Sequence, residues 1–219
     1  MLSEKLAQVE ERMHAAAARA GRARADVTLI AVTKKFPASV IREAYGLGLR
    51  VFGENYVQEF EGKHAAVADL EGAEFHLIGH LQSNKAKPAA ELFSVIQTLD
   101  SEKLARRVEG MGNPLEVMIE VKLSEEQAKA GAAPEEVPRV IDAIRTCAHL
   151  RLTGLMTMPP WSDDAEVTRP YFRKLAALAR LHGLTKLSMG MSHDLEAAIE
   201  EGATHIRVGT ALFGPRTKP

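Results

Sequence analysis

A pair of lysines follows the first apolar run of the chain. The run LIAVT ends at Thr33, and Lys34 and Lys35 come directly after it. A primary amine among apolar walls has its charged form disfavoured, so its pKa falls and the neutral nucleophile can condense with an aldehyde. Alternation along a strand places Lys34 and Lys35 on opposite faces and does not say which one faces inward. One of them is a candidate Schiff-base lysine, and a solvated surface charge is the ordinary alternative.

Two turns near the carboxyl end of the chain combine glycine with a hydroxyl group. The segment MGMS ends at Ser192 and precedes the helical pattern HDLEAAIEEG, so we expect a helix that begins at or just after Ser192, with Ser192 as its N-cap. Gly209 and Thr210 form the second turn. Glycine permits close backbone approach, and N–H groups at a helix start bind dianions. The two turns predict a phosphate site; a capped helix and a glycine that relieves crowding are the alternatives.

An arginine lies inside an otherwise apolar run beside the second turn. Arg207 is two residues before Gly209, so both share one face of a strand. A buried charge requires a partner. The residues slightly favour a structural ion pair with Glu54 or Glu120. The alternative is donation to a ring nitrogen of a bound heterocycle, as an arginine does in some pyridoxal phosphate sites.

These groups together describe a pocket for a phosphorylated aldehyde that carries a basic ring nitrogen. Pyridoxal 5'-phosphate (PLP) has an aldehyde for the lysine, a phosphate for the two glycine turns and a ring nitrogen for the arginine. Without Arg207, the same lysine and cradle would suit a Schiff-base aldolase that acts on a phosphosugar. Arg207 is therefore the residue that discriminates between the two ligands.

The segments that must position these groups alternate between a strand-like and a helix-like spacing of apolar residues. Short β-branched runs suited to buried strands are each followed by a longer stretch with helical spacing. The predicted strands are VTLIAVT from Val27, RVFGE from Arg50, EFHLIGH from Glu74, SVIQTL from Ser94, LEVMIEV from Leu115, LRLTGLMTM from Leu150, KLSMG from Lys186 and HIRVGTALF from His205. Eight similar units favour a single closed (β/α)8 TIM-type barrel over an open doubly wound sheet. In such barrels the active side chains lie at the carboxyl ends of the strands, and phosphate is often bound after strands seven and eight.

The intervening segments predict helices, and one predicts a loop. The amino terminus reads as a first helix, and Ser101 and Gly112 bracket another. Further helices are predicted over ASVIREAYGLG, EEVPRVIDAIRTCAHL and DDAEVTRPYFRKLAALARLHG. The segment from Leu123 to Pro138 is rich in small residues, acids and proline, and we expect a long exposed loop. No stretch resembles a linker, so residues 1–219 are expected to form one domain.

Composition excludes several classes of protein. The chain has 219 residues, 46% of them hydrophobic, and a single cysteine, Cys147, so a disulfide scaffold is not expected. A net charge of -1 gives no field to gather nucleic acid. No apolar run approaches the roughly 20 residues that cross a bilayer. We expect a cytoplasmic protein without membrane, nucleic-acid or metal partners.

Five segments carry a resemblance that runs nearly end to end. They are AVTKKFP, FGENYVQE from Phe52, FHLIGHLQSNK from Phe75, LTGLMTM from Leu152, and LSMGMSHDLEAAIEEGATHIRVGTALFG from Leu187. With them the sequence resembles the YggS/PROSC family of pyridoxal phosphate homeostasis proteins. The resemblance implies a barrel like the amino-terminal domain of alanine racemase without that enzyme's second domain.

The resemblance also assigns the site. It implies an internal aldimine on Lys34, a phosphate held by Ser192, Gly209 and Thr210, and a pyridine nitrogen faced by Arg207. It further implies that Asn55 lines the pocket. Thr33 stands where the family more often has serine, and the loop after Leu123 is less similar, keeping only Lys129 and Gly131.

The functional prediction is a binding protein. We expect the chain to carry PLP as a Lys34 aldimine, to act as a monomer in PLP homeostasis with PLP-dependent apoenzymes as possible recipients, and to show no robust turnover. An arginine at the ring nitrogen weakens the electron sink that carbanion chemistry needs. The alternative is a racemase-like enzyme that acts on amino acids, with a second acid or base drawn from Tyr56, His76, His80 and His193.

Overall fold

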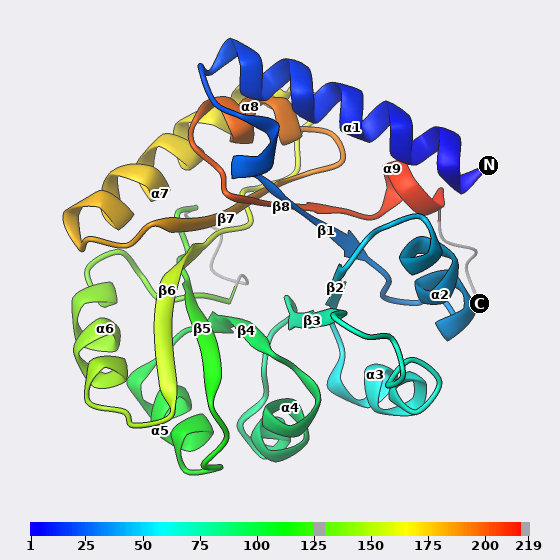
Figure 1. Cartoon of the computed structure of the whole chain (residues 1–219). Helices are drawn as coiled ribbons and strands as arrows, with labels where there is room; N and C mark the ends of the chain where they lie inside the picture. Colours follow the sequence, from blue (N-terminus) through cyan, green and yellow to red (C-terminus); the bar gives the residue numbers. More distant parts are fainter. Residues whose placement is uncertain (125–129, 216–219) are drawn as a thin grey trace.

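Eight parallel strands close into one barrel and follow their order in the sequence (Figure 1). The computed structural model describes residues 1–124 and 130–215. The strands are β1 (Thr28–Val32), β2 (Val51–Glu54), β3 (Glu74–Leu77), β4 (Val95–Leu99), β5 (Leu115–Glu120), β6 (Leu150–Met156), β7 (Lys186–Met191) and β8 (His205–Val208). The predicted (β/α)8 barrel is confirmed, because β8 pairs with β1 and leaves no open edge.

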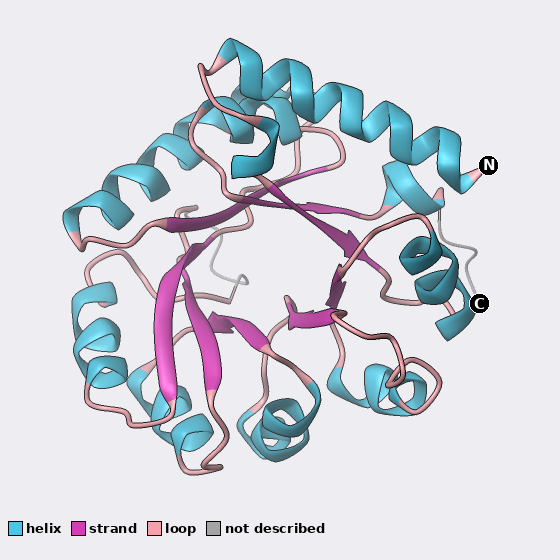
Figure 2. Ribbon diagram, in the orientation of Figure 1, coloured by secondary structure: helices cyan, strands magenta, loops and turns pink. Residues whose placement is uncertain are grey.

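Helices form an outer layer around the strands (Figure 2). They are α1 (Leu2–Arg19), α2 (Ala38–Gly46), α3 (Val57–His64), α4 (Ala86–Leu92), α5 (Glu102–Glu109), α6 (Val137–Arg145), α7 (Arg169–Leu181), α8 (Leu195–Glu200) and α9 (Thr210–Phe213). Within the described residues, no helix is both long and apolar enough to span a bilayer.

The core lies between the strands and this outer layer. Strands covered on both sides read as continuous apolar runs, and β1 shows this pattern, since four of its five residues are buried. An aromatic cluster packs β2 and β3 against α3: the rings of Phe52 and Phe75 are stacked with centroids 5.6 Å apart, and Phe60 lies 4.6 Å from Phe75. Burial of this kind, at about 25 cal/mol per Å² of apolar surface, fixes the frame on which the strand ends are displayed.

Helix α1 precedes the first strand and crosses the outside of the barrel next to α8 and α9 (Figure 1). Its buried face consists of Val9, Met13, Ala16 and Ala17. Arg12 and Arg19 form ion pairs with Glu196 and Glu200 of α8. The helix therefore packs behind the turns that follow β7 and β8.

Some predicted boundaries are wrong. The last predicted strand continued to Phe213, but β8 ends at Val208 and Thr210–Phe213 is the short helix α9. Thr210 and the residues after it form helical hydrogen bonds, so an apolar run does not by itself tell strand from helix. Helix α7 begins at Arg169 rather than near Asp163, after a separate 3-10 turn.

The predicted loop also ends earlier than expected. Helix α6 begins at Val137, and Pro138 lies in its first turn, where a missing N–H is tolerated. Residues 125–129, which include Lys129, lie outside the described residues. The predicted cap at Ser101 is confirmed, since its side chain accepts a hydrogen bond of 3.3 Å from the backbone N–H of Leu104.

Candidate functional site

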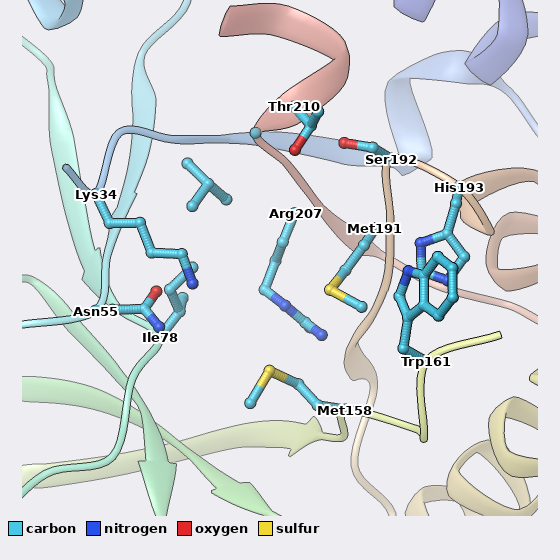
Figure 3. A pocket seen from close by; sticks show the side chains of 12 residues that line it. Lys34, Asn55, Ile78, Met158, Trp161, Met191, Ser192, His193, Arg207 and Thr210 are labelled. Carbon is cyan, nitrogen blue, oxygen red and sulfur yellow. The ribbon is translucent and has the colours of Figure 1, made fainter. Parts of the chain in front are cut away.

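A cavity of about 200 Å³ opens at the carboxyl ends of the strands (Figure 3). All six residues that the sequence and the resemblance proposed for the site line it. The lining consists of Val32, Lys34, Asn55, Ile78, Met158, Trp161, Met191, Ser192, His193, Arg207, Gly209 and Thr210. Closure of the barrel therefore brings together groups that are up to 176 positions apart in the chain, from Lys34 to Thr210.

Lys34 is the lysine that lines this cavity. It is half-buried and shares a strand face with Val32, another lining residue, whereas Lys35 is exposed. Lys35 has a φ of 65°, and its backbone N–H donates to Glu59 Oε1 at 2.5 Å. The left-handed turn at Lys35 ends the alternation. The structure thus separates two neighbours that the sequence could not tell apart.

The turn before Lys34 is fixed by buried polar contacts. The Thr33 hydroxyl donates to Glu54 Oε1 at 2.7 Å, and Lys63 Nζ donates to the same oxygen at 3.0 Å and to the Thr33 carbonyl at 3.1 Å. Glu54 is fully buried. Burial raises the pKa of its carboxyl group, and Lys63 and Thr33 act against that shift. These contacts join the ends of β1 and β2 and set the point at which Lys34 leaves the barrel.

Ser192 and Thr210 lie at the opposite side of the cavity from Lys34, with their hydroxyl groups turned toward each other (Figure 3). The backbone N–H of Ala211, in the first turn of α9, donates to Ser192 Oγ at 3.2 Å. Arg12 Nη2 donates to the Ser192 carbonyl at 3.0 Å. The turns after β7 and β8 are therefore joined by a side chain and supported by α1.

The predicted N-cap role of Ser192 is wrong. Helix α8 begins at Leu195, with Asp194 at the N-cap position, and residues 192–194 form a turn. Asp194 Oδ1 accepts from the backbone N–H of Met191 at 2.6 Å. A short carboxylate side chain can bond to the backbone of its own turn. Ser192 is consequently available to the neighbouring helix α9 and to the cavity.

Arg207 is 3% exposed and extends into the cavity from β8 (Figure 3). Its guanidinium donates to the Ser188 hydroxyl at 2.8 Å and to the Thr157 carbonyl at 2.9 Å. Burial lowers the pKa of Arg207 to about 10, so it remains a cation at neutral pH. Among the described residues, Arg207 forms no direct ion pair with Glu54 or Glu120, although the nearby charges of Asp194 and Glu120 oppose the fall in the Arg207 pKa.

A directional chain of hydrogen bonds runs from Arg207 through the barrel interior. Arginine only donates, so the Ser188 hydroxyl accepts from it and donates to Gln97 Oε1 at 2.6 Å. Gln97 Nε2 then donates to His76 Nδ1 at 2.9 Å, which places the His76 proton on Nε2, 3.5 Å from Glu74 Oε2. These hydrogen bonds fix the orientation of the Arg207 guanidinium and leave its positive charge in place.

Asn55 brings an unpaired polar atom to the cavity. Its Oδ1 is buried and has no hydrogen-bond partner among the described residues. The backbone around Asn55 approaches Gly79 so closely that a Cβ at Gly79 would lie 2.2 Å from the Asn55 carbonyl oxygen. Only glycine permits this approach. A buried unpaired carbonyl costs about 1–3 kcal/mol, and a ligand donor would remove that cost.

Sequence reasoning missed the apolar part of the lining. Ile78 follows β3 directly, Met191 ends β7, and Met158 lies two residues after β6. The rule that strand ends face the mouth could have found all three. The Trp161 ring is 68% exposed and lies 6.0 Å from the His193 ring, and both line the cavity.

The predicted acid–base candidates do not gather at one place. His193 lines the cavity, whereas His76 belongs to the series of hydrogen bonds in the barrel interior. Tyr56 is 51% exposed and His80 lines a neighbouring cavity. Across residues 1–124 and 130–215, no group of three or more His, Cys, Asp or Glu side chains could hold a metal ion.

The arrangement fits a ligand with three distinct ends. An amine, a pair of hydroxyl groups and a buried cation lie around one cavity, and Asn55 Oδ1 lacks a donor. An aldehyde, a phosphate and a basic ring nitrogen match these groups in kind. The donor set thus fits PLP.

Comparison with known proteins agrees with this chemistry. The family described as "Alanine racemase, N-terminal domain" matches residues 5–217. A pyridoxal phosphate homeostasis protein from Pseudomonas aeruginosa is 46% identical over 221 residues, which cover 98% of this chain and 96% of that protein. PipY of Synechococcus elongatus PCC7942 superposes with a TM-score of 0.87 without PLP and 0.85 with PLP bound, at 39% and 38% identity. Both PipY matches cover 98% of this chain and 100% of that one. The chain therefore belongs to the YggS/PROSC family of pyridoxal phosphate homeostasis proteins, within the alanine racemase N-terminal domain family.

Proposed function

We propose that this protein binds PLP in the cavity at the carboxyl end of the barrel and serves intracellular PLP homeostasis. The observation that carries the proposal is the placement of Lys34 opposite the Ser192 and Thr210 hydroxyls, with Arg207 between them (Figure 3). Relatives named for PLP homeostasis and the PLP-bound structure of PipY support it.

Each residue has a distinct part in this proposal. Lys34 Nζ binds the aldehyde carbon covalently. Ser192 and Thr210 donate to the phosphate, and Gly209 allows the backbone to approach it. Arg207 donates to the ring nitrogen, while Asn55 Oδ1 accepts from a ligand hydroxyl group. When bound, PLP supplies an electrophilic carbon and a conjugated ring.

The residues around the proposed PLP site favour carriage of the cofactor over catalytic turnover of a substrate. Arg207 remains a cation and only donates, so it keeps the ring nitrogen unprotonated and weakens the electron sink. His193 is the one predicted acid–base residue in the described lining. Exposed Trp161 leaves the mouth in contact with water, which weakens electrostatic stabilisation of a transition state. We therefore propose a carrier without robust turnover.

Three further features belong to the same proposal. The six proposed site residues lie at the mouth of one closed barrel, and we propose a monomer whose residues 1–219 form one PLP-binding domain. A single cysteine supports a cytoplasmic location. PLP-dependent apoenzymes are the proposed recipients of the cofactor.

The absorbance spectrum of the purified protein tests the proposal. We expect a visible band that borohydride removes, with the modified residue mapped to Lys34. Lys34→Ala abolishes the band and the matched neighbour Lys35→Ala retains it. Absence of a band after incubation with PLP, or its retention in Lys34→Ala, contradicts the assignment. Exchange of the alanine α-proton with solvent deuterium, above that of free PLP, would indicate the racemase-like alternative.

A further inference from the structure

Four buried side chains form a series across the barrel interior, from the proposed PLP site toward the amino end. They are Arg207 of β8, Ser188 of β7, Gln97 of β4 and His76 of β3, and none is more than 3% exposed. Strands β4 and β7 are not neighbours in the barrel (Figure 1), so the hydrogen bond of 2.6 Å between Ser188 and Gln97 spans the interior. Orientation of Arg207 alone does not explain why the series continues to a histidine.

The amide of Gln97 gives this series its direction. Its Oε1 accepts the Ser188 proton, and its Nε2 donates to His76 Nδ1 at 2.9 Å. If the amide turned over, Nε2 would face a Ser188 oxygen that already accepts from Arg207, and the Ser188 proton would lose its acceptor. The observed orientation therefore requires an Nδ1 without a proton, which is found only in a neutral His76.

A second proton on His76 removes the acceptor on which this orientation depends. Both nitrogens of an imidazolium donate, so an Nδ1–H would face the Gln97 amide N–H, and the amide has to turn over and present Oε1. The Ser188 proton then loses its acceptor, and a second cation joins Arg207 in the barrel interior. Both changes weaken the hydrogen bond that orients the Arg207 guanidinium at the cavity.

Charged and titratable groups from β3, β7 and β8 surround His76. Glu74 Oε2 lies 3.5 Å from His76 Nε2, and this contact is the main cause of the lowered pKa of Glu74. The ring of His205 lies 6.3 Å from the His76 ring, and Lys186 and Arg207 act on His205 as well. Burial lowers the pKa of His205 to about 3, so His205 is neutral at pH 5 and above. A carboxylate is thus placed to pair with a second proton on His76.

We propose that His76 and Gln97 are positioning residues for the PLP ring nitrogen, and that PLP binds more tightly when His76 is neutral than when it carries a second proton. The inference rests on the proposed function, because Arg207 is the group assigned to the ring nitrogen. Linkage acts in both directions, so bound PLP weakens proton binding at His76 by the same factor. Protonation at the amino end of the barrel thereby releases the cofactor at the opposite end.

Histidine NMR on the unmodified protein tests this linkage. The side-chain resonances of His76, assigned by their absence in His76→Asn, are followed from pH 8.5 to pH 5 without cofactor and with PLP bound. We expect the midpoint of the His76 titration to be lower by about one pH unit with PLP, which corresponds to a tenfold linkage. The carbocyclic analogue of PLP, in which a C–H group replaces the ring nitrogen, should leave the midpoint unchanged.

Two variants separate positioning from a general loss of structure. His76→Asn retains an acceptor for Gln97 and does not titrate, so it should match the PLP affinity of the unmodified protein at pH 8.5 and exceed it about fivefold to tenfold at pH 5. Protonation of the ligand is the same for both proteins and cancels in this ratio. Gln97→Leu breaks the series, and we expect PLP affinity to fall about tenfold at pH 8.5 while affinity for the carbocyclic analogue is unchanged.

The matched control is His205→Gln, which replaces a buried histidine of the same cluster that lies outside the series and should retain the PLP affinity of the unmodified protein and its dependence on pH. The inference is overturned if PLP leaves the His76 midpoint unchanged, if the carbocyclic analogue moves it equally, or if His76→Asn keeps the pH dependence of the unmodified protein. Equal loss of both ligands in Gln97→Leu would also contradict it, and the NMR titration decides the question if that variant does not fold. Failure of the proposed function is seen separately, as the absence of a visible band with PLP at any pH.

Discussion

The two ends of the barrel differ in how far their buried polar side chains are paired by hydrogen bonds. At the carboxyl end, five buried side-chain atoms lack hydrogen-bond partners among the described residues: Glu54 Oε2, Asn55 Oδ1, Glu120 Oε2, His193 Nε2 and Asp194 Oδ2. At the amino end, His76 bonds to Gln97, and Lys186 Nζ contacts Glu116 at 2.8 Å. At the amino end one such atom, His182 Nε2 directly after α7, lacks a partner among the described residues, so most of the unpartnered buried atoms lie at the carboxyl end, beside the cavity.

This difference separates stability from function within one sheet. A buried polar group without a partner costs about 1–3 kcal/mol, so several at one end reduce the stability of the fold, and a ligand that pairs with them restores part of it. In barrels of this kind the ligand-binding site generally lies at the carboxyl ends of the strands. The series of hydrogen bonds from Arg207 to Glu74 connects the two ends of the barrel. Through it, hydrogen-bonded side chains of the interior orient the Arg207 guanidinium at the cavity.

The largest expected effect on PLP affinity concerns Ser192 and Thr210, the two hydroxyl groups proposed to bind the phosphate. The double variant Ser192→Ala/Thr210→Val removes two donors to an anion, each worth about 1.5–3 kcal/mol, so PLP affinity should fall by roughly a hundredfold or more. Affinity for pyridoxal, which lacks the phosphate, should change little. Equilibrium titration of the cofactor-free protein with each compound measures both.

A hydroxyl at the amino end provides the control for that variant. Thr204 Oγ1 accepts from the Leu187 N–H at 2.8 Å and contacts His205 Nδ1 at 2.8 Å. Thr204→Val should lower the free energy of unfolding by about 1–3 kcal/mol and leave PLP affinity unchanged. Equal loss of PLP and pyridoxal in the double variant, or loss of PLP binding in Thr204→Val, would contradict the division between the ends.

The second prediction uses one titrating group from each end. Burial raises the pKa of Glu120 from 4.5 to about 7, so the folded state binds more protons and stability is lost as the pH rises through that range. Burial, with His76 and Lys186 nearby, lowers the pKa of His205 from 6.5 to about 3, so stability is lost as the pH falls below 6.5. The two groups therefore change the free energy of unfolding in opposite directions as the pH rises.

Urea unfolding at several pH values measures both windows. Relative to the unmodified protein, Glu120→Gln should gain on the order of 3 kcal/mol between pH 4.5 and pH 8. His205→Gln should gain about 2 kcal/mol between pH 8 and pH 5. The comparison concerns the slope with pH, so a constant loss from altered packing does not affect it. Parallel pH profiles for the two variants would contradict the assigned shifts.

The sequence predicted the architecture well because periodicity reports burial. Eight β-branched runs separated by helical segments allow few topologies, and the rule on strand ends directs attention to Lys34 and to the turns after β7 and β8. Asn55 entered through the family resemblance, although it follows β2 directly and the same rule on strand ends could have found it. A residue that faces a cavity from an irregular turn leaves no periodic signal.

The errors arise where register or turn geometry decides. The residues slightly favour a carboxylate partner for Arg207, but its guanidinium donates to Ser188 and to the Thr157 carbonyl. Ser188 lies on the neighbouring strand, where the register between β7 and β8 shifts between Ser188 and Met191. Ser192 was assigned to its own helix, yet its hydroxyl accepts from α9. Neither the register of neighbouring strands nor contact between turns of different strands can be read along one segment of sequence.

The smallest expected effect concerns the support of the phosphate turn from outside the barrel. Arg12 pairs with Glu196 and donates to the Ser192 carbonyl, while Arg19 of the same helix pairs with Glu200. Both ion pairs are partly exposed, so each alanine variant should lose at most about 1 kcal/mol of unfolding free energy. Only Arg12→Ala loosens the turn that carries Ser192, and we expect its PLP affinity to fall about threefold to tenfold while that of Arg19→Ala is unchanged. Equal PLP affinities in the two variants would show that the turns after β7 and β8 keep their geometry without α1, and that the mouth of the barrel is organised from the strands alone.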